Sequence, residues 1–148
     1  MECTSSARYA VGVASIDRLH EECEDLLAQL AEVVATGADA SLTLERLREH
    51  LTRHFEHEEA LMASTGFPPA GCHQREHASV LEVVVEVQRR YAQGDGDPLS
   101  RLPDAVLEWF GIHASSMDAA LAAWLNAPRS GMPAEAPSQA GCGAPATG

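Results

Sequence analysis

Apolar residues recur at steps of three and four along four successive stretches of this chain, and no other feature constrains its fold as strongly. That spacing places the apolar side chains on one face of an α-helix. Residues that end or begin helices stand between the stretches: Gly37 with Asp39, Gly66 with Pro68, and the segment 94–98. The predicted helices run over about 15–34, 41–64 and 72–91, and from a start between Ser100 and Pro103 to Asn126.

Four helices of roughly 20 residues joined by short loops are most simply arranged as an up-down-up-down four-helix bundle, an all-α fold. The Val83–Val85 run does not predict a strand, because it falls within a helical period. The 148 residues suffice for one domain with a single core. We expect residues 1–14 to form an extended arm across the bundle and residues 15–126 to form the bundle. Residues 127–148 hold half of the prolines and are expected to form a flexible tail.

The charge of the chain argues against one large class of partners. The 22 acidic residues outnumber ten basic ones, all of them Arg, and give a net charge of -12. Nucleic-acid binding needs clustered basic residues, so we expect no nucleic-acid partner. No uncharged apolar run approaches the ~20 residues of a membrane span. The N-terminus lacks the basic and apolar regions of a signal peptide, so we expect a cytoplasmic protein without a membrane partner.

Each predicted helix carries side chains of the metal-binding type on its otherwise apolar face. Residues four apart leave the same face of a helix, because that step rotates by ~400°. Taken singly, each of these side chains has an ordinary explanation, as a hydrogen-bonded core residue or as one of a pair on a helix face, and for His20 and for His54 with Glu58 that explanation is the better one. Together, five imidazoles and two carboxylates in an empty core would each cost on the order of several kcal/mol, which a metal cluster avoids. The seven candidate ligands are His20, His54, Glu58, His73, His77, His113 and Asp118.

One of these pairs does not fit a regular helix. His113 and Asp118 are five residues apart, and on an α-helix this step turns the second side chain ~140° away from the first. We therefore predict either a π-bulge in this stretch, as is common at functional sites, or a sideways reach of Asp118 towards the cluster.

The same residues give the chain a resemblance to a known family. Taken together, four motifs resemble those of the bacterial hemerythrins over most of residues 9 to 126. They are Val11-Gly12-Val13 with Ile16-Asp17 and His20, His54-Phe55-x-x-Glu58-Glu59 with Leu61-Met62, Gly66-Phe67-Pro68 followed by His73-x-x-x-His77, and Trp109-x-x-x-His113-x-x-x-x-Asp118.

The resemblance implies two iron ions as cofactors and reversible dioxygen binding as the function, for storage, delivery or scavenging. One iron would be six-coordinate, and the other five-coordinate with an open position for dioxygen. Mixed imidazole and carboxylate ligands suit iron. In the family pattern the first iron takes His73, His77 and His113, the second takes His20 and His54, and Glu58, Asp118 and an oxo or hydroxo group bridge them.

The resemblance also implies an oxygen pocket walled by Phe55, Trp109, Phe110 and Ala114, although these residues are equally well explained as ordinary core. The family usually has Ile at the position of Ala114. A smaller wall leaves a larger or wetter pocket, so we expect faster autoxidation than in a relative with the bulkier residue.

Several residues stay open to more than one interpretation. His50 stands where the family commonly has an aromatic residue. It is either a partly exposed or hydrogen-bonded histidine, or a group that contacts a ligand or even binds the open iron. His57 is expected at the surface and Cys23 in the core. Cys72 precedes a helix N-terminus, where a thiolate is favoured, so a redox role with Cys142 is conceivable.

Two other function classes fit the same ligands. A di-iron enzyme acting on peroxide or nitric oxide would use the same open iron, and the ligand set does not separate it from an oxygen carrier. A stand-alone oxygen or redox sensor would have to transmit its state through the arm or the tail, because no signalling domain is evident in the sequence.

Overall fold

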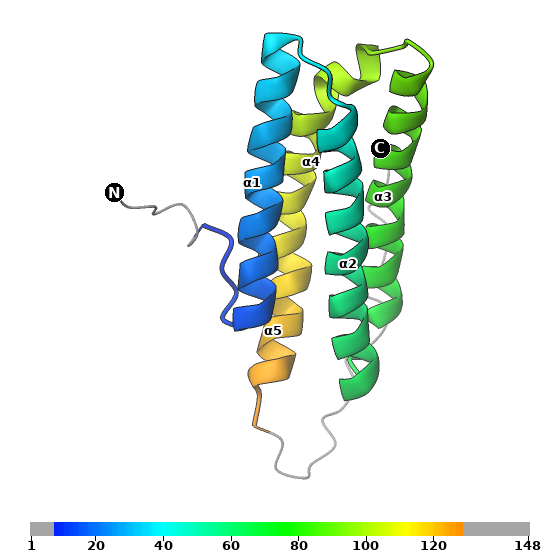
Figure 1. Ribbon diagram of the computed structural model, residues 1–148. Helices are drawn as coiled ribbons and strands as arrows, with labels where there is room; N and C mark the ends of the chain where they lie inside the picture. The colour runs from blue at the N-terminus through cyan, green and yellow to red at the C-terminus, as the bar shows by residue number, and fades with distance from the viewer. Residues whose placement is uncertain (1–7, 129–148) are drawn as a thin grey trace, which may run out of the picture.

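A computed structural model of the chain describes residues 8–128. Its helices lie side by side and alternate in direction, and these residues contain no strand (Figure 1). α1 and α3 each pack against both α2 and α4, which confirms the predicted four-helix bundle. The elements are α1 (Ala14–Thr36), α2 (Ser41–Thr65), α3 (Ala70–Ala92), α4 (Asp97–His113), the π-helical turn η2 (Ala114–Asp118) and α5 (Ala119–Asn126).

Two of the helices end on glycine in the left-handed conformation. Gly37 follows α1 with φ of 74°, and Gly66 follows α2 with φ of 70°. The chain then turns back, so that Ala38 N donates to the Val33 carbonyl over 3.2 Å and Phe67 N donates to the Met62 carbonyl over 3.0 Å. These turns are the glycine C-caps that the sequence indicated.

The fourth helix begins earlier than predicted. α4 starts at Asp97, and Pro98 rather than Pro103 occupies its first turn. Either proline would suit a first turn. The earlier start buries Leu99 and Leu102 on the same face as Val106, and Pro103 lies buried inside the helix. The sequence expectation for this boundary was therefore wrong by about one turn.

The bundle core consists of two apolar clusters. The larger one contains Leu27, Leu47 and Val84 among many others, and a smaller one contains Ile16, Met62, Phe67 and Leu121. The candidate ligands stand between members of these two clusters along the chain, although on α3 the member ahead of them, Phe67, lies just before the helix. On α1, for example, His20 lies between Ile16, which belongs to the smaller cluster, and Cys23, which belongs to the larger one. The polar residues therefore form a layer with apolar side chains above and below it.

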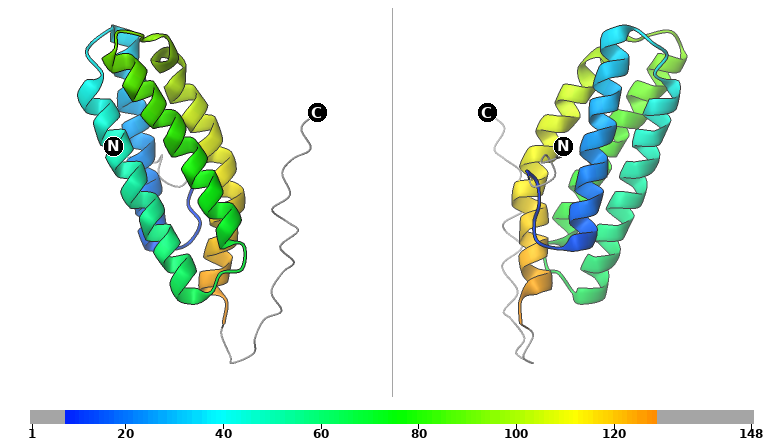
Figure 2. Two further views of the ribbon diagram at one scale, coloured as in Figure 1. Left: turned by 90° about the vertical axis from the view of Figure 1, so that its right-hand side faces the viewer. Right: turned by 60° about the vertical axis from the view of Figure 1, so that its left-hand side comes forward.

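The described part of the N-terminal arm, residues 8–13, lies against the bundle (Figure 2). The Asp17 carboxylate in the first turn of α1 accepts hydrogen bonds from Val11 N (2.6 Å) and Gly12 N (3.2 Å). The Tyr9 ring meets Phe110 edge-on, with ring centroids 5.0 Å apart. The expectations for residues 1–7 and for nearly all of the tail lie outside the described residues.

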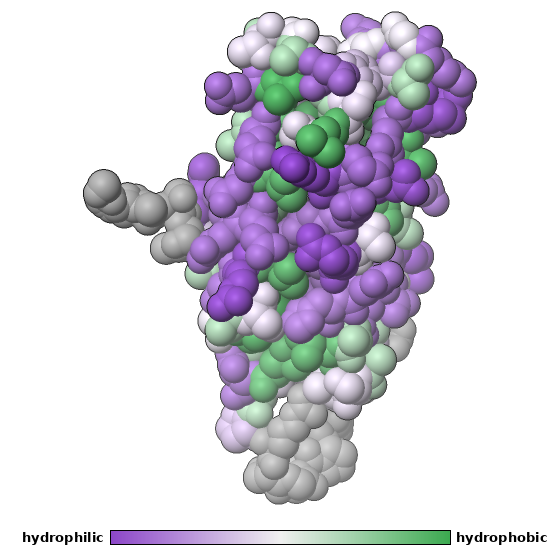
Figure 3. Space-filling model, in the orientation of Figure 1, coloured by the Kyte–Doolittle hydropathy of each residue, from purple (hydrophilic) through white to green (hydrophobic). Residues whose placement is uncertain are grey.

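The surface over α1 and α2 is mainly hydrophilic, with smaller apolar areas between the charged side chains (Figure 3). Within residues 8–128, none of the helices combines the length and the hydropathy needed to cross a membrane.

Candidate metal centre

All four helical columns of the bundle contribute to one buried polar cluster. The seven residues singled out in the sequence are between 0% and 3% exposed and lie together. α1 supplies one of them, α2 and α3 supply two each, and the column of α4 and η2 supplies two. The i, i+4 pairs of α2 and α3 point to the interior, as their spacing predicts.

A first group of donors contains three histidines and two carboxylates, all with ligand atoms within 4.8 Å of one another. His77 Nε2 lies 3.2 Å from His113 Nε2 and 3.2 Å from Glu58 Oε1. His73 Nε2 lies 2.9 Å from Asp118 Oδ1. Five side chains thus converge on one point, and three of them offer an imidazole nitrogen.

A second group contains two histidines with the same two carboxylates, also within 4.8 Å of one another. His20 Nε2 lies 2.9 Å from Asp118 Oδ2, and His54 Nε2 lies 3.0 Å from Glu58 Oε2. The second group therefore has one imidazole fewer than the first.

The two carboxylates divide their oxygens between the groups. Glu58 turns Oε1 towards His77 and Oε2 towards His54. Asp118 turns Oδ1 towards His73 and Oδ2 towards His20. Each carboxylate can therefore give one oxygen to a metal in each group, which is the arrangement that a bridging ligand requires.

The π-helical turn η2 brings Asp118 into the cluster. It begins directly after His113 and ends at Asp118, so the five-residue step spans this wider turn. On a regular helix the Asp118 side chain would point ~140° away from that of His113. His113 Nε2 in fact lies 3.2 Å from Asp118 Oδ1. The predicted π-bulge is therefore present.

The cluster strongly perturbs the protonation of its members when no metal is bound. Burial alone would lower the pKa of His20, but hydrogen bonds to Asp118 and Glu58 outweigh it and raise the pKa to about 10. The same balance raises the pKa of His73 to about 9. Burial would raise the pKa of Asp118 and of Glu58, but the surrounding histidines hold both well below their usual range. Without metal the cluster is thus held together by ion pairs.

Some atoms of the cluster are nevertheless poorly satisfied without a metal. Glu58 Oε1 is buried and accepts no well-formed hydrogen bond within residues 8–128, although it faces two imidazoles. His77 Nε2 and His113 Nε2 face each other across 3.2 Å, where only one of them can carry a proton. A cation between these groups would satisfy all of them, and imidazole with carboxylate is a donor set that iron and zinc both accept. The residues therefore fit a metal.

The outward nitrogens of the histidines contact residues that the sequence analysis did not assign. His20 Nδ1 lies 2.8 Å from the Tyr9 carbonyl oxygen, and His77 Nδ1 lies 2.9 Å from Glu59 Oε2. Glu76 on α3 accepts a hydrogen bond from Trp109 Nε1 over 3.1 Å and stands 3.9 Å from His113 Nδ1. Such outer partners orient metal-binding imidazoles.

Aromatic rings close the cluster on its sides. Phe55 stacks on His77 with ring centroids 3.9 Å apart, and Trp109 stacks on His113 at 4.5 Å. Phe110 meets His20 edge-on at 5.0 Å. Phe55 and Trp109 therefore cover the three-histidine group, and Phe110 covers the two-histidine group. Ala114, the fourth expected wall residue, is fully buried at the start of η2.

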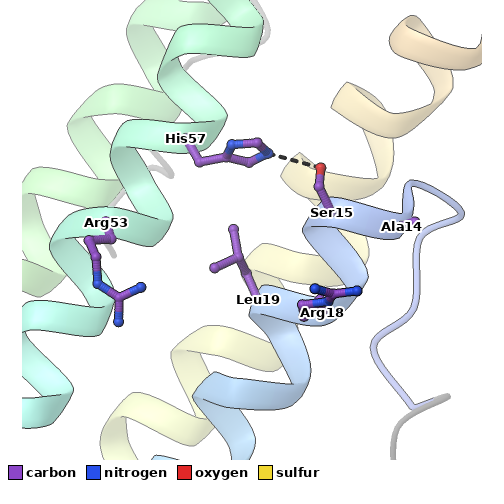
Figure 4. A pocket seen from close by; sticks show the side chains of 6 residues that line it. All are labelled: Ala14, Ser15, Arg18, Leu19, Arg53 and His57. Atoms are coloured by element: carbon purple, nitrogen blue, oxygen red, sulfur yellow. Dashed lines mark hydrogen bonds between the residues drawn. The ribbon is translucent and has the colours of Figure 1, made fainter.

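The remaining histidines lie outside both donor groups. His50 is fully buried one turn before His54, and burial with the neighbouring charges of His54 and Arg53 lowers its pKa to about 3. His57 was expected at the surface. It is half-buried, and its Nε2 pairs with Ser15 Oγ over 2.9 Å at a cleft between α1 and α2 (Figure 4). The cleft is lined by Ala14, Ser15, Arg18, Leu19, Arg53 and His57.

Within residues 8–128, neither Cys23 nor Cys72 belongs to either donor group. Cys23 is buried in the core, as expected, and burial raises the pKa of its thiol to about 12. The redox role considered for Cys72 with Cys142 cannot be followed within the described residues, because Cys142 lies in 129–148.

The fold and the cluster define an all-helical metal-binding protein, and sequence comparison gives its family. Residues 11–125 match the family described as "Hemerythrin HHE cation binding domain". A bacteriohemerythrin of Ralstonia nicotianae is 37% identical over 115 residues, covering 78% of this chain and 82% of the relative. The chain belongs to the hemerythrin family.

Two more distant relatives carry the same name. A bacteriohemerythrin of Methylococcus capsulatus is 23% identical over 116 residues, which is 77% of this chain and 88% of that protein. One of Stenotrophomonas maltophilia is 26% identical over 114 residues, covering 76% and 74%. No solved structure matches the chain significantly.

Proposed function

We propose that this protein holds two iron ions in its buried cluster and binds dioxygen reversibly at one of them. The division of the carboxylate oxygens carries the proposal. Glu58 and Asp118 each present one oxygen to the three-histidine group and the other to the two-histidine group. A single metal would leave half of these donors unused, whereas two metals use all seven side chains.

The difference between the groups supports an open position on one iron. The three-histidine group offers five protein donors and the two-histidine group offers four. With one further ligand shared between them, an iron in the first group would have six ligands and an iron in the second would have five. The irons supply the electrons that dioxygen takes up on binding. We therefore assign His73, His77 and His113 to the closed iron, and His20 and His54 to the open one.

The protein's own part is to position the ligands and to exclude water. The apolar clusters above and below the polar layer shield it from solvent, and aromatic rings cover its sides. A dry site limits proton delivery and so favours release of dioxygen over irreversible oxidation. We propose Phe55, Trp109, Phe110 and Ala114 as the walls of the oxygen pocket, with Phe110 nearest the two-histidine group.

We propose a cytoplasmic location for this activity. We expect dioxygen as the ligand, and the excess of acidic residues argues against a nucleic-acid partner.

The decisive experiment is a cycle of oxygenation and evacuation. Protein loaded anaerobically with Fe²⁺ is exposed to air and then evacuated again, and its visible absorption is recorded throughout. A charge-transfer band that appears in air and vanishes under vacuum supports reversible binding. Irreversible conversion to a ferric species, with turnover of added peroxide or nitric oxide, would identify an enzyme instead.

Metal content tests the centre independently of oxygen. We expect two iron ions per chain in the wild type and a large loss in the double variant His73→Ala/His77→Ala, because both residues belong to the three-histidine group. The exposed change Gln74→Ala on the same helix is the matched control. Full metal retention in the double variant would contradict the assignment.

A further inference from the structure

His50 is a buried polar residue that belongs to neither donor group of the cluster. It is 0% exposed and stands one helical turn before His54 on α2. Its Nε2 lies 3.1 Å from His54 Nδ1, and the two rings meet nearly at right angles with centroids 5.1 Å apart. His50 therefore hydrogen-bonds to the side chain of His54, and it also contacts the backbone of Leu19.

As a metal ligand, His54 would need a hydrogen-bond acceptor for the ring nitrogen that faces away from the cluster. Its Nε2 faces the cluster, 3.0 Å from Glu58 Oε2, so Nε2 is the atom that can bind a metal. A metal-binding imidazole carries its proton on the other nitrogen, and the acceptor of that N–H fixes both the tautomer and the ring orientation. For His54 the other nitrogen is Nδ1, and the atom it faces is His50 Nε2.

Two other candidate ligands have an oxygen acceptor at this position, whereas Nδ1 of His73 and of His113 makes no hydrogen bond within residues 8–128. His20 Nδ1 faces the Tyr9 carbonyl oxygen at 2.8 Å, and His77 Nδ1 faces the Glu59 carboxylate at 2.9 Å. Among the outward Nδ1 atoms of the described candidate ligands, only that of His54 contacts a second imidazole. Orienting His54 would therefore explain why His50, which belongs to neither donor group, is buried here.

We propose that His50 is a positioning residue of the metal centre, whose Nε2 accepts the hydrogen bond of the His54 Nδ1–H and so holds His54 with Nε2 free for the metal. The inference rests on the proposed role of His54 as a ligand and extends it to a residue outside the ligand set.

The surroundings of His50 fit this direction of the hydrogen bond. When Nε2 accepts, the proton of the neutral ring sits on Nδ1. That atom faces the carboxylate of Glu22, with Nδ1 and Oε1 3.6 Å apart, and the Glu22 side chain is 47% exposed. An N–H at this position would lie near a negative charge, at a separation longer than a hydrogen bond. The opposite direction would turn a lone pair of His50 towards that carboxylate.

The test compares two substitutions that differ in their ability to accept a hydrogen bond. His50→Leu keeps an apolar side chain of moderate size in the core but removes the acceptor, whereas His50→Gln retains an acceptor oxygen at the same turn. His57→Gln is the matched control, because His57 lies on the same helix outside both groups. The readout is Fe²⁺ affinity, measured anaerobically against a competing chelator, with helicity and Tm recorded for every protein.

We expect His50→Leu to lower the affinity for the iron of the two-histidine group by about 10- to 100-fold, which is the usual cost of losing an outer partner. His50→Gln should stay within about threefold of the wild type. His57→Gln should match the wild type. Equal affinity in His50→Leu, or an equal loss in both His50 variants, would overturn the positioning role. A wild type that takes up no metal would instead overturn the proposed function.

A second measurement does not depend on how the variants fold. In wild-type protein loaded with diamagnetic Zn²⁺, long-range ¹H–¹⁵N NMR identifies the protonated nitrogen of each histidine. The proposal requires a proton on Nδ1 of His54 and none on Nε2 of His50. A proton on His50 Nε2 would overturn it.

A Zn²⁺ titration of the wild type and the variants tests whether His50 is itself a metal ligand. Cys23, His50 and His54 have ligand atoms within 4.8 Å of one another and could together take a thiolate-binding metal. If the wild type binds an additional Zn²⁺ that both His50→Leu and Cys23→Ser lose, His50 is a ligand rather than a positioning residue, and the proposal fails.

Discussion

At the scale of the residue, the two carboxylates determine how many metals the cluster can hold. The histidines each present one nitrogen to one donor group, whereas Glu58 and Asp118 belong to both groups. Their burial is otherwise unfavourable, since a carboxylate without solvent needs strong compensating partners. Loss of either carboxylate should therefore affect both proposed metal positions at once.

Replacing Glu58 with Gln should reduce the proposed pair of irons to one ion or none. The amide keeps the size of the side chain but has a single oxygen, and its NH₂ group does not bind a cation. Iron content per chain, measured by atomic absorption, checks this. Glu56→Gln, an exposed change on the same helix, should leave the content unchanged. A full complement of iron in Glu58→Gln would show that the carboxylate does not bridge.

Replacing Ala114 with Ile should slow oxidation of the ferrous protein in air. Ala114 is fully buried at the start of η2, and a larger side chain there would reduce the space for water near the cluster. The added carbons can also destabilise the fold by about 1–3 kcal/mol. Stopped-flow absorption in air-saturated buffer gives the rate. The exposed change Ala123→Ile is the control, and an unchanged rate in Ala114→Ile would refute the expectation.

Sequence reasoning found the inward side chains but not their outer partners, and the cause is physical. The seven candidate ligands are unusual residues for an apolar helix face, so each one is visible in the pattern. The Tyr9 carbonyl that faces His20 is a backbone group, which every residue has. Glu76 looks like any solvated acid. Glu59 stands inside a recognised motif, and that motif was the one signal that could have revealed it.

At the scale of the element, local geometry was predictable where spacing alone determined it. The five-residue step from His113 to Asp118 cannot put both side chains on one face of an α-helix, and η2 resolves it. The start of α4 was not predictable in this way, because Pro98 and Pro103 both suit a first turn. The choice between them depends on the burial of Leu99 and Leu102, which only packing decides.

Deleting Ser116 from η2 should leave the cluster able to bind metal. A π-helical turn holds one residue more than an α-helical turn, so removal of an exposed serine converts it to a regular helix with the Asp118 carboxylate still facing inward. Deleting the exposed Glu108 from the regular part of α4 should instead abolish binding, because it rotates the following residues by ~100°.

Iron content and helicity of the two deletion variants check this contrast. Equal loss of iron in both would mean that η2 provides a geometry that a regular helix cannot reproduce. Helicity close to that of the wild type in the Ser116 deletion is needed for the comparison to be valid.

At the scale of the whole molecule, the polar layer lies between two apolar clusters and is stabilised differently with and without metal. The metal-free layer depends on ion pairs between protonated histidines and the two carboxylates. Metal requires those histidines to be neutral, so binding releases protons. The stability of the two forms should therefore respond to pH in opposite ways.

The metal-free protein should lose stability as the pH rises from about 6.5 to about 10. The pKa values of His20 and His73 rise in the folded state from 6.5 to about 10 and about 9. Their contribution to the stability of the folded state is complete below pH 6.5, and it disappears as the pH rises through the raised pKa values. Asp118 and Glu58 have lowered pKa values, so their contribution is lost on the acid side.

Thermal unfolding in excess chelator at pH 6 to 9 measures this effect. The iron-loaded protein should show a flatter or rising Tm over the same range, because its metal-binding histidines are neutral and have lost the proton that gave them a positive charge. A metal-free Tm that increases towards pH 9 would contradict the ion-pair description of the empty cluster.

The position of Tyr9 has a practical consequence for anyone who handles this protein. Its backbone carbonyl faces the outward nitrogen of His20, and its ring packs on Phe110. The ring also lies close to Gly111, where an added Cβ would be 3.4 Å from it. The segment ahead of the first helix thus supports two residues of the proposed site, His20 and Phe110, from behind. Affinity tags and truncations belong at the other terminus, since an expression vector that trims or crowds Tyr9 would alter the colour and ligand chemistry of the purified sample.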